Sequence, residues 1–493
     1  MAPKSVADLA TLVAGTVVGD GRVEVSDATH DSRDAGPDTL FIAVRGARHD
    51  GHVFVADAVS AGSPAVCVSE DVTTTATRIV VPDTRAAMGP LAASVHDDPS
   101  AAVPVLGVTG TNGKTTVTHF SESILRAAGR NPGLIGTVGS RVADRVFPTV
   151  RTTPEATDFQ RLLARMRDAG ADVIATEVSS HALELGRVAG THFAVAAFTN
   201  LSQDHLDFHG DMDSYGAAKR RLFTEYDVGT AVINLDDPFG RVLSESASAP
   251  VTTVGRGGDL EASNIAYSHD ATSFTLTIGG EDHRVAAPVL GAFNVANIVV
   301  AAGCCLALGV APTVIAEAIT GLSGVPGRFE LVSAGSGSRV FVDYAHTPDS
   351  ITAAIEAARE MAPKRVIALI GAGGDRDAEK RPQMGRAASG ADVVVVTSDN
   401  PRSEDPADIA ATVEAGIAPD VARIIDLDRR SAIEKAIAMA ASDDIVLILG
   451  KGHEPGQEIA GEVFPFDDRA VAREVLGIDE STGAKPDSGS MYQ

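Results

Sequence analysis

The sequence predicts an α/β protein of three domains: a small α/β N-terminal domain (residues 1–98), a central P-loop domain on a parallel sheet (99–325) and a C-terminal doubly wound, Rossmann-like domain (326–478). Three observations support this division. A chain of 493 residues is too long for one ordinary core. Short apolar runs alternate with helical patterns, and Asp/Pro-rich and Gly/Pro-rich breaks interrupt the alternation at residues 97–100 and 324–327. Residues 479–493 are small and polar, so we expect a disordered tail.

Composition excludes several classes of partner. The 41 Lys and Arg residues against 66 Asp and Glu residues give a net charge of −25, which repels nucleic acid and anionic membranes. No run of 18 apolar residues occurs, so we expect neither membrane insertion nor export. The three cysteines, Cys67, Cys304 and Cys305, cannot form a disulfide framework and indicate a reducing cytoplasm.

The N-terminal domain is predicted from six segments. Helical patterns cover residues 6–14, 53–61 and 84–96, and apolar runs typical of strands cover 40–44, 65–68 and 79–81. Two polar clusters separate them, Asp31-Ser32-Arg33 and Arg48-His49-Asp50-Gly51-His52. On the residues alone, each cluster is either a solvated loop or a binding loop.

The other two domains repeat the alternation. In the central domain we expect strands at 103–108, 172–178, 194–199 and 230–234, a more β-like stretch at 272–278, and helices at 117–128 and 294–308. This order predicts a parallel sheet covered on both faces. In the C-terminal domain we expect strands at 339–342, 365–370, 393–396 and 445–449, and helices at 349–361, 406–417 and 431–441.

The stretch TGTNGKTT, residues 109–116, follows an apolar strand and precedes a helix, which is the order that a phosphate site needs. Glycines there allow backbone N–H groups to turn onto phosphate oxygens, a lysine supplies charge, and a threonine hydroxyl can bind magnesium. The spacing differs from a standard Walker loop, because Val108 stands where the first glycine belongs and Gly107 comes one residue too early. The predicted phosphate-binding residues are Gly110, Thr111, Asn112, Gly113, Lys114, Thr115 and Thr116.

Four residues of the central domain are candidates for metal or base chemistry. Glu177 ends a predicted strand beside the loop and suits magnesium, although a purely structural acid is the alternative. His205 and His209 have the i, i+4 spacing of a zinc helix, but the catalytic Glu is missing and Gly210 would end the helix, which favours magnesium. Lys219 precedes two arginines that would lower its pKa, and any burial would lower it further. It is therefore a base, a site of reaction with carbon dioxide, or part of a solvated basic face.

Three polar strings of the C-terminal domain each follow a predicted strand, so they can meet at one sheet edge. Arginine takes a carboxylate bidentately and an acid takes an ammonium, so this mixture suits a zwitterion. The strings are Gly374-Asp375-Arg376-Asp377, Asp399-Asn400-Pro401-Arg402 and Gly450-Lys451-Gly452-His453-Glu454.

Together these residues resemble the Mur ligase family of ATP-dependent amide-bond-forming enzymes of peptidoglycan synthesis. The resemblance covers nearly the whole chain, in order. It rests on TGTNGKTT, Arg151-Thr152-Thr153-Pro154, Glu177-Val178-Ser179-Ser180-His181, residues 204–210, Ala217-Ala218-Lys219, GAFNVAN at 291–297, Gly327-Arg328-Phe329-Glu330 and Asp343-Tyr344-Ala345-His346-Thr347-Pro348.

The resemblance implies an activity and its requirements. It implies addition of meso-diaminopimelate to the D-glutamate γ-carboxylate of UDP-N-acetylmuramoyl-L-alanyl-D-glutamate through an acyl phosphate, in the cytoplasm and by a monomer. ATP, two Mg²⁺ ions and a carbamylated Lys219 are implied, and the C-terminal domain should close over the site by a hinge at residues 324–327.

The resemblance also assigns residues to ligands. It implies catalysis by Lys114, Lys219, His205 and Glu177, and Mg²⁺ ligation by Thr115, Glu177, His205 and Lys219. It implies ATP contacts from Asn294, Arg328 and Asp343, besides the loop. UDP-dipeptide contacts would come from Ser32, Ala47, Arg48, His49, Thr152, Thr153, Ser179 and Arg187. Diaminopimelate contacts would come from Arg376, Asp399, Asn400, Pro401, Arg402, Gly450 and Glu454.

Two positions depart from the family pattern, which often has Asn at Arg151 and Gln at Leu185. Three alternatives stay open on the sequence: a lysine-adding Mur ligase, which would differ near Arg402; a folylpolyglutamate synthase, which would lack the first domain; and a regulatory P-loop module, which would not explain the 399–402 string.

Overall fold

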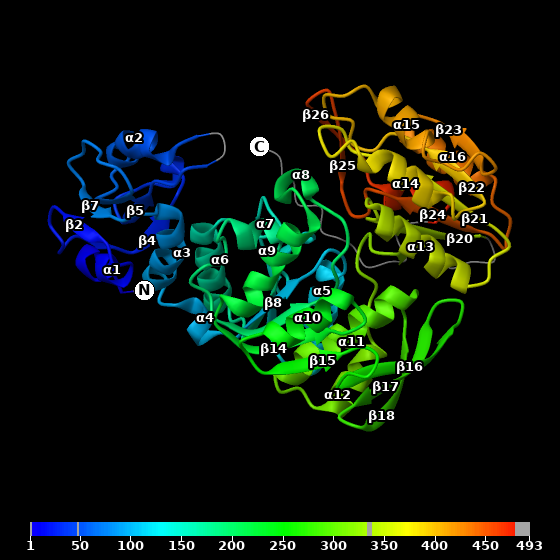
Figure 1. The fold of residues 1–493 in the computed structure, drawn as a ribbon, viewed down its shortest axis with the longest axis horizontal. Coiled ribbons are helices and arrows are strands. Elements are labelled where there is room, and N and C mark those ends of the chain that lie inside the picture. The colour runs from blue at the N-terminus through cyan, green and yellow to red at the C-terminus, as the bar shows by residue number, and fades with distance from the viewer. Residues whose placement is uncertain (1, 47–48, 333–337, 479–493) are drawn as a thin grey trace.

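The computed structural model describes residues 2–46, 49–332 and 338–478. The chain forms three lobes, each built on a sheet with helices packed against it, and the N-terminal lobe lies at the opposite end of the molecule from the C-terminal lobe (Figure 1). The predicted α/β class with three sheet-based bodies is confirmed. The expected disordered tail, 479–493, lies outside the described residues.

The N-terminal lobe has a five-stranded sheet in the order β2-β7-β6-β5-β4. Its elements are β1 Lys4–Ser5, α1 Val6–Leu12, β2 Thr16–Val18, β3 Glu24–Val25, β4 Asp27–Thr29, η1 Ser32–Asp34, β5 Thr39–Ile42, η2 Gly51–Phe54, α2 Val55–Ser60, β6 Ala65–Val68, β7 Thr77–Val80 and α3 Thr84–Val95. The three predicted strands (β5, β6, β7) and three predicted helices are confirmed. Strands β4 to β7 are parallel, and α1 and α3 cover one face of them while α2 covers the other.

The segment predicted as a linker, residues 97–100, is ordered and tightly packed. Asp97 and Asp98 both have positive φ, 56° and 45°, and Pro99 opens the short helix α4, Pro99–Ala102. The buried Ser100 hydroxyl accepts a hydrogen bond from the His192 backbone N–H at 3.0 Å. Close packing of α3 on the central lobe removes the freedom that Pro and Asp suggested in the sequence.

The central lobe has an 11-stranded sheet in the order β11-β10-β9-β12-β8-β13-β14-β15-β16-β17-β18. Its strands are β8 Val105–Thr109, β9 Pro132–Gly136, β10 Gly139–Val142, β11 Arg145–Phe147, β12 Val173–Glu177, β13 Phe193–Phe198, β14 Val228–Asn234, β15 Val251–Val254, β16 Leu260–Tyr267, β17 Thr272–Ile278 and β18 Glu281–Ala287. Strands β9 to β16 of this order are parallel, which confirms the predicted parallel sheet. Antiparallel strands extend the sheet at both edges, and the β-like stretch predicted at 272–278 is one of them, β17.

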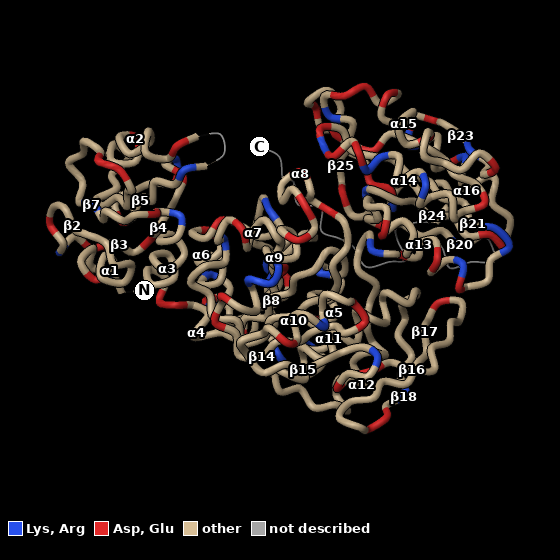
Figure 2. Tube along the Cα trace, viewed as in Figure 1, with Lys and Arg blue, Asp and Glu red and all other residues tan. Residues whose placement is uncertain are grey.

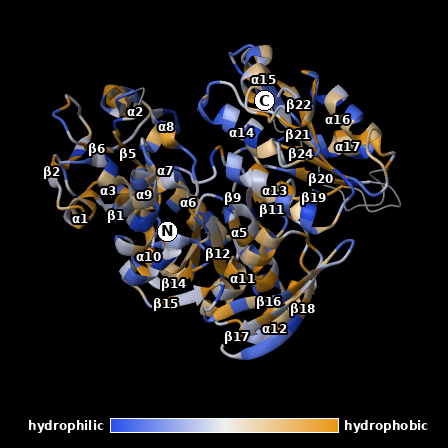
Figure 3. Cartoon of the chain, turned by 45° about the vertical axis from the view of Figure 1, so that its right-hand side comes forward, coloured by the Kyte–Doolittle hydropathy of each residue, from blue (hydrophilic) through white to orange (hydrophobic). Residues whose placement is uncertain are grey.

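Helices cover both faces of this sheet, as predicted. They are α5 Lys114–Ala127, α6 Ala156–Asp168, α7 Ser180–Glu184, α8 Leu206–His209, α9 Met212–Thr224, α10 Pro238–Ser246, α11 Ala292–Ala307 and α12 Pro312–Ile319. Helices α5, α11 and α12 pack into one core, and α6, α9 and α10 into the other. Figure 3 shows hydrophobic residues along α11 and hydrophilic residues at the outer end of β17 and β18.

The C-terminal lobe has a six-stranded sheet in the order β19-β20-β24-β21-β22-β23. Its elements are β19 Glu330–Leu331, β20 Arg339–Asp343, α13 Pro348–Glu360, β21 Val366–Ile370, α14 Lys380–Ala388, β22 Val393–Val396, α15 Pro406–Glu414, β23 Ala422–Ile425, α16 Arg429–Ala438, β24 Ile445–Leu449, β25 Gly456–Ile459, β26 Glu462–Pro465 and α17 Asp468–Val475. Within the six-stranded sheet all strands but β19 are parallel, and helices cover both faces, which confirms the doubly wound prediction. Strands β25 and β26 form a separate antiparallel pair.

Candidate active site

A cavity of about 460 Å³ lies where the phosphate loop, the carboxyl ends of the central strands and the first loop of the C-terminal lobe meet. Parallel strands bring their carboxyl ends to one edge, so residues far apart in the sequence line one space. Basic segments lie beside α9 and also in the C-terminal lobe around α14, and acidic segments are spread over all three lobes (Figure 2). The lining includes the predicted residues Thr111, Asn112, Gly113, Lys114, Thr115, Thr116, Thr152, Glu177, Ser179, His205, Lys219, Arg328 and Asp343.

The phosphate loop has the geometry that its glycines predict. Gly110 and Gly113 have φ of 148° and 86°, which L side chains rarely adopt. A Cβ on Gly113 would lie 2.3 Å from the Asn297 Oδ1 atom, so there is also no room for one. Helix α5 begins directly after this loop, at Lys114, and its N-terminal N–H groups favour an anion. The loop is therefore preorganised for phosphate.

Glu177 lies at the end of β12 with almost no solvent exposure. Its Oε2 accepts from the Thr115 hydroxyl at 3.0 Å, and its Oε1 accepts from the Thr137 backbone N–H at 2.7 Å. Arg328, from the C-terminal side of the cavity, also donates to the Thr115 hydroxyl, at 3.1 Å. The Glu177 carboxylate, the Thr115 hydroxyl and the Arg328 guanidinium therefore meet at the place where the sequence predicts ligands for magnesium and phosphate.

Lys219 is buried against the phosphate loop. Its Nζ donates to the Gly110 carbonyl at 2.8 Å and lies 4.3 Å from the centroid of the Tyr215 ring. Burial lowers its pKa well below the usual value, and the nearby Lys114 lowers it further, while Asp204 opposes both. The pKa of Lys219 is low, as predicted, and burial is the largest cause; the neighbouring cation that lowers it further is Lys114 and not the two following arginines.

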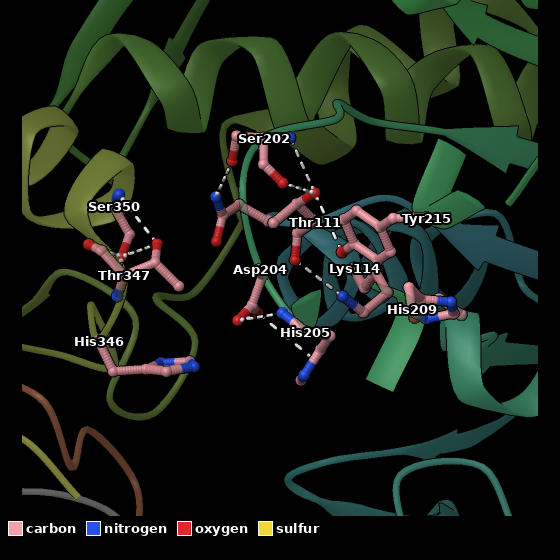
Figure 4. A network of polar contacts seen from close by, with 12 residues as sticks. Thr111, Lys114, Ser202, Asp204, His205, His209, Tyr215, His346, Thr347 and Ser350 are labelled. Carbon is pink, nitrogen blue, oxygen red and sulfur yellow. Dashed lines mark hydrogen bonds and ion pairs between the residues drawn. The ribbon is translucent and has the colours of Figure 1, made fainter. Parts of the chain in front are cut away.

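Three histidine rings gather beside Lys219. His205 precedes α8 with φ of 55°, and Gly210 ends that helix, as predicted. The His181 ring stands 4.8 Å from the His205 ring and 5.6 Å from the His209 ring, centroid to centroid. Burial lowers the pKa of His205 to about 4, with Asp204 opposing it. Figure 4 shows His205 and Lys114 on the same side of the site as Tyr215.

The zinc alternative gains no support. Among the described residues, the group of three or more His, Cys, Asp and Glu residues that could hold a metal by proximity is Asp50, His52 and Glu70, in the N-terminal lobe. Both acids of that group pair with Arg45, which accounts for their proximity. His205 and His209 are not part of such a group.

The predicted nucleotide residues divide between two adjoining cavities. Asn294 lines a second cavity of about 280 Å³, which shares Thr116 and Arg328 with the first. The Asn294 side chain donates to the Leu290 carbonyl at 2.8 Å. Asp343, at the end of β20, accepts from the Phe329 backbone N–H at 2.5 Å, and burial raises its pKa to about 6, although Arg328 opposes the rise.

The predicted UDP-dipeptide residues are only partly brought together. The Thr153 hydroxyl donates to the Glu177 carbonyl at 2.8 Å, and Ser179 caps α7. Arg187 pairs with Glu155 at 2.9 Å, and Arg151, the first departure from the family pattern, pairs with the same carboxylate at 2.7 Å.

The N-terminal candidates lie apart from this group. Ser32, in η1, and the exposed His49 do not line the 460 Å³ cavity. Ala47 and Arg48 lie outside the described residues.

The predicted diaminopimelate residues meet at strand ends of the C-terminal lobe but do not line the 460 Å³ cavity. Asn400 donates to Glu454 at 2.8 Å. Arg402, with φ of 52°, donates to the Gly374 carbonyl at 2.6 Å and pairs with Glu458 at 3.2 Å. The remaining members of the predicted set are Arg376 and Asp399, with Pro401 and Gly450 beside them; a Cβ on Gly450 would lie 2.5 Å from Asp399 Oδ2.

Family models match most of the chain in the order of the lobes. They are the Mur ligase family catalytic domain (residues 24–96), the Mur ligase middle domain (108–305) and the Mur ligase glutamate ligase domain (327–452). A Geobacillus thermodenitrificans relative is 45% identical over 464 residues, covering 92% of this chain and 95% of the relative. The chain belongs to the Mur ligase family.

That relative is named UDP-N-acetylmuramoyl-L-alanyl-D-glutamate--2,6-diaminopimelate ligase. A relative from Aquifex aeolicus has the same name; it is 41% identical, and the match covers 93% of this chain and 95% of the relative. A solved structure of a ligase of that name has a TM-score of 0.71 and 31% identity, covering 97% of this chain and 99% of that chain. The MurF ligase of Thermotoga maritima in complex with ADP shares the fold, with a TM-score of 0.62 at 20% identity and coverage of 92% and 96%.

Three further residues were named in the sequence only as members of motifs, without a role of their own. Lys451 is fully buried, donates to Asn400, Glu454 and the Gly456 carbonyl, and was visible only as a lysine between two glycines. Asp204 and His346 line the main cavity from opposite lobes.

In the described part of the chain, no helix has the length and apolar content needed to cross a bilayer.

Proposed function

We propose that this Mur ligase uses ATP to join meso-diaminopimelate to the D-glutamate γ-carboxylate of UDP-N-acetylmuramoyl-L-alanyl-D-glutamate, in peptidoglycan precursor synthesis. The carrying observation is the 45% identity, over nearly the full length of both chains, to a ligase with that name. The phosphate loop, Glu177, Lys219 and Arg328 in one cavity supply the groups that such a reaction requires.

The chemistry follows from charge. A carboxylate is a poor electrophile, so a carboxylate oxygen of the acceptor attacks the γ-phosphorus of ATP, the bond to ADP breaks, and an acyl phosphate forms. The free amine of diaminopimelate then attacks the acyl carbon, the bond to phosphate breaks, and the amine loses a proton. Lys114 and Arg328 are placed to stabilise the charge on the transferring phosphoryl group.

The residues beside the loop fit magnesium. Mg²⁺ prefers oxygen ligands and keeps some of its waters, and the Thr115 hydroxyl and Glu177 carboxylate offer such oxygens at the cavity. We infer that Thr115, Glu177 and His205 hold magnesium, and that carbamylated Lys219 would add an anionic oxygen ligand for a second ion. Bound Mg²⁺ would neutralise phosphate charge.

We assign the adenosine of ATP to the second cavity. The apolar side chains of Leu290, Pro326 and Phe329 line it, and the Asn294 amide is its polar partner for a base. Thr116 and Arg328 border both cavities, so a nucleotide with its base in the second cavity can reach the phosphate loop in the first.

A reaction that consumes ATP also supports a cytoplasmic location.

The diaminopimelate residues do not line the main cavity, so the C-terminal lobe must approach for transfer. Residues 324–327 join the lobes. A Cβ on Gly327 would lie 2.1 Å from the His453 backbone nitrogen, whereas a Cβ on Gly324 would have no neighbour within 4 Å, so we expect the rotation at Gly324. Closure would also keep water from the acyl phosphate. Scattering profiles that stay unchanged on adding nucleotide and UDP-dipeptide would contradict closure.

The test of the function is ADP release measured with each substrate omitted in turn. We expect release to require both the UDP-dipeptide and meso-diaminopimelate, with L-lysine a poor replacement. Equal use of lysine would favour the lysine-adding alternative. Release of ADP without an amino acid would favour a regulatory ATPase.

A further inference from the structure

Asp204 is a carboxylate of the central lobe that faces the C-terminal lobe across the main cavity (Figure 4). Its side chain is 10% exposed, and its Oδ1 accepts from the His205 backbone N–H at 3.0 Å. The carboxylate and the peptide that carries His205 are therefore held together. A displacement of the Asp204 carboxylate would therefore also displace His205, the next residue in the chain.

A lysine of the other lobe meets this carboxylate. Lys380 is the first residue of α14, and its Nζ lies 3.7 Å from Asp204 Oδ1, with its side chain 19% exposed. The pair is thus mostly shielded from water, where an ion pair is screened less than at the surface. This ion pair and the hydrogen bond from Arg328 to the Thr115 hydroxyl both join the central lobe to the C-terminal lobe at this cavity.

Hydrogen bonds and an ion pair join the start of α14, which carries Lys380, to the predicted amino-acid loops. The next residue, Arg381, pairs with Glu404 at 2.7 Å and donates to the Gly373 carbonyl at 3.2 Å. Glu404 accepts from the Asp375 backbone N–H at 2.5 Å. Arg402 also donates to the Gly374 carbonyl. The loops around Arg376 and Arg402 therefore move with the start of α14.

We propose that Lys380 is a positioning residue, whose ion pair with Asp204 fixes the amino-acid-binding loops relative to the segment that carries His205. The inference rests on the proposed function, because it takes the incoming amine to be held by those loops. Breaking the pair leaves the phosphate loop intact but removes a contact that aligns the C-terminal lobe with the central lobe before it closes for transfer. The apparent affinity for the amino acid should fall, and that for ATP should not.

The kinetic test compares three variants. Lys380→Met keeps the length of the side chain without its charge, and Lys380→Arg keeps the charge. Lys435→Met is the matched control, because Lys435 forms a 2.6 Å ion pair with Asp426 in the same lobe and is not among the residues lining the main cavity. We expect Lys380→Met to raise the KM for diaminopimelate about tenfold and to leave the KM for ATP within about twofold. Lys380→Arg should recover most of the loss.

Amide hydrogen exchange provides a readout that does not need activity. In Lys380→Met, the amides of residues 205–209 and 380–383 should exchange faster than in the unmutated protein, with no such change in Lys435→Met. If the unmutated protein makes no ADP with diaminopimelate, the proposed function fails, while the exchange data still test the link. The inference is overturned if Lys380→Met behaves like Lys435→Met in both measurements, or if Lys380→Arg is as impaired as Lys380→Met.

Discussion

Lys114 and Lys219 donate to the same atom, the carbonyl oxygen of Gly110, at 2.9 and 2.8 Å. Burial lowers the pKa of both amines, and Lys114 lowers the pKa of Lys219 further. Two buried ammonium groups on one acceptor repel each other, so Lys219 is the amine more readily found neutral. A neutral amine can take up carbon dioxide, which replaces a like charge next to Lys114 with an opposite one.

The first prediction concerns this modification. Lys219→Arg keeps a cation but cannot form a carbamate, so we expect kcat to fall at least about 100-fold. Lys219→Ala should be equally impaired, and added formate or acetate should restore part of its activity by supplying the missing carboxylate. Full activity of Lys219→Arg, or a Lys219 of unmodified mass in the active enzyme, would remove the carbamate from the mechanism.

The second prediction concerns Glu177. Glu177→Gln retains one acceptor oxygen for Thr115 or Thr137 but loses the negative charge, so the fold should persist while magnesium binds less well. We expect the Mg²⁺ concentration for half-maximal activity to rise about tenfold or more. The measurement is a Mg²⁺ titration of ADP release, with thermal unfolding as the control. An unchanged titration curve would make Glu177 a structural acid.

Arg402 carries the third prediction. Diaminopimelate differs from lysine by a carboxylate on its distal carbon, and the guanidinium is the group suited to bind it bidentately. We expect Arg402→Ala to raise the KM for diaminopimelate about 100-fold and to leave the KM for ATP unchanged. Arg423→Ala, which removes an ion pair with Glu414 in the same lobe, is the control. If both variants respond alike, the specificity lies elsewhere.

The fourth prediction concerns pH and Asp343. Burial raises its pKa to about 6, so the ionised carboxylate destabilises the ligand-free fold. The favourable contribution of the protonated form is complete below the unfolded pKa, near 4, and is lost as the pH rises through about 6. Asp343→Asn should therefore raise the free energy of unfolding by about 2 kcal/mol at pH 8 and by little at pH 4. Denaturant unfolding at the two pH values checks this, and an equal effect at both would contradict it.

The fifth prediction concerns the N-terminal lobe. A Cβ on Gly89, in α3, would lie 2.3 Å from the Ala189 carbonyl oxygen of the central lobe. Gly89→Ala must therefore separate the lobes, and we expect a loss of about 1–3 kcal/mol in stability and a higher KM for the UDP substrate. Gly321→Ala, where the added Cβ would lie 3.6 Å from the Ala318 carbonyl oxygen, is the control. A thermal midpoint equal to that of the control would contradict the prediction, because it would show that the backbone around Ala189 moves to accommodate the added Cβ at no cost in stability.

Local sequence patterns predicted the parts of the site that depend on neighbours in the chain. The glycines of the phosphate loop require positive φ, and the helix starts at Lys114 because strand, loop and helix follow one another directly. Glu177 was found because it ends a predicted strand beside the loop, whereas Asp343 was assigned only by the family resemblance. Such features need only a few consecutive residues to be recognised.

Features that depend on distant residues were missed or misattributed. The low pKa of Lys219 comes from burial and from Lys114, more than a hundred residues earlier, and not from adjacent arginines. The antiparallel strands at the sheet edges were mostly unpredicted, because β16, with which they pair on one side, exposes half of its residues and lacks a clean alternation. The Asp204 and Lys380 pair joins two lobes and has no signature in either segment.

The central claim is that ATP activates the γ-carboxylate before the amine attacks. The most direct measurement uses UDP-dipeptide labelled with ¹⁸O in that carboxylate and follows the label by mass spectrometry after turnover with diaminopimelate. The account predicts that one labelled oxygen appears in the released phosphate, because the carboxylate oxygen bridges carbon and phosphorus in the acyl phosphate. Phosphate without label, formed together with the amide product, would contradict it.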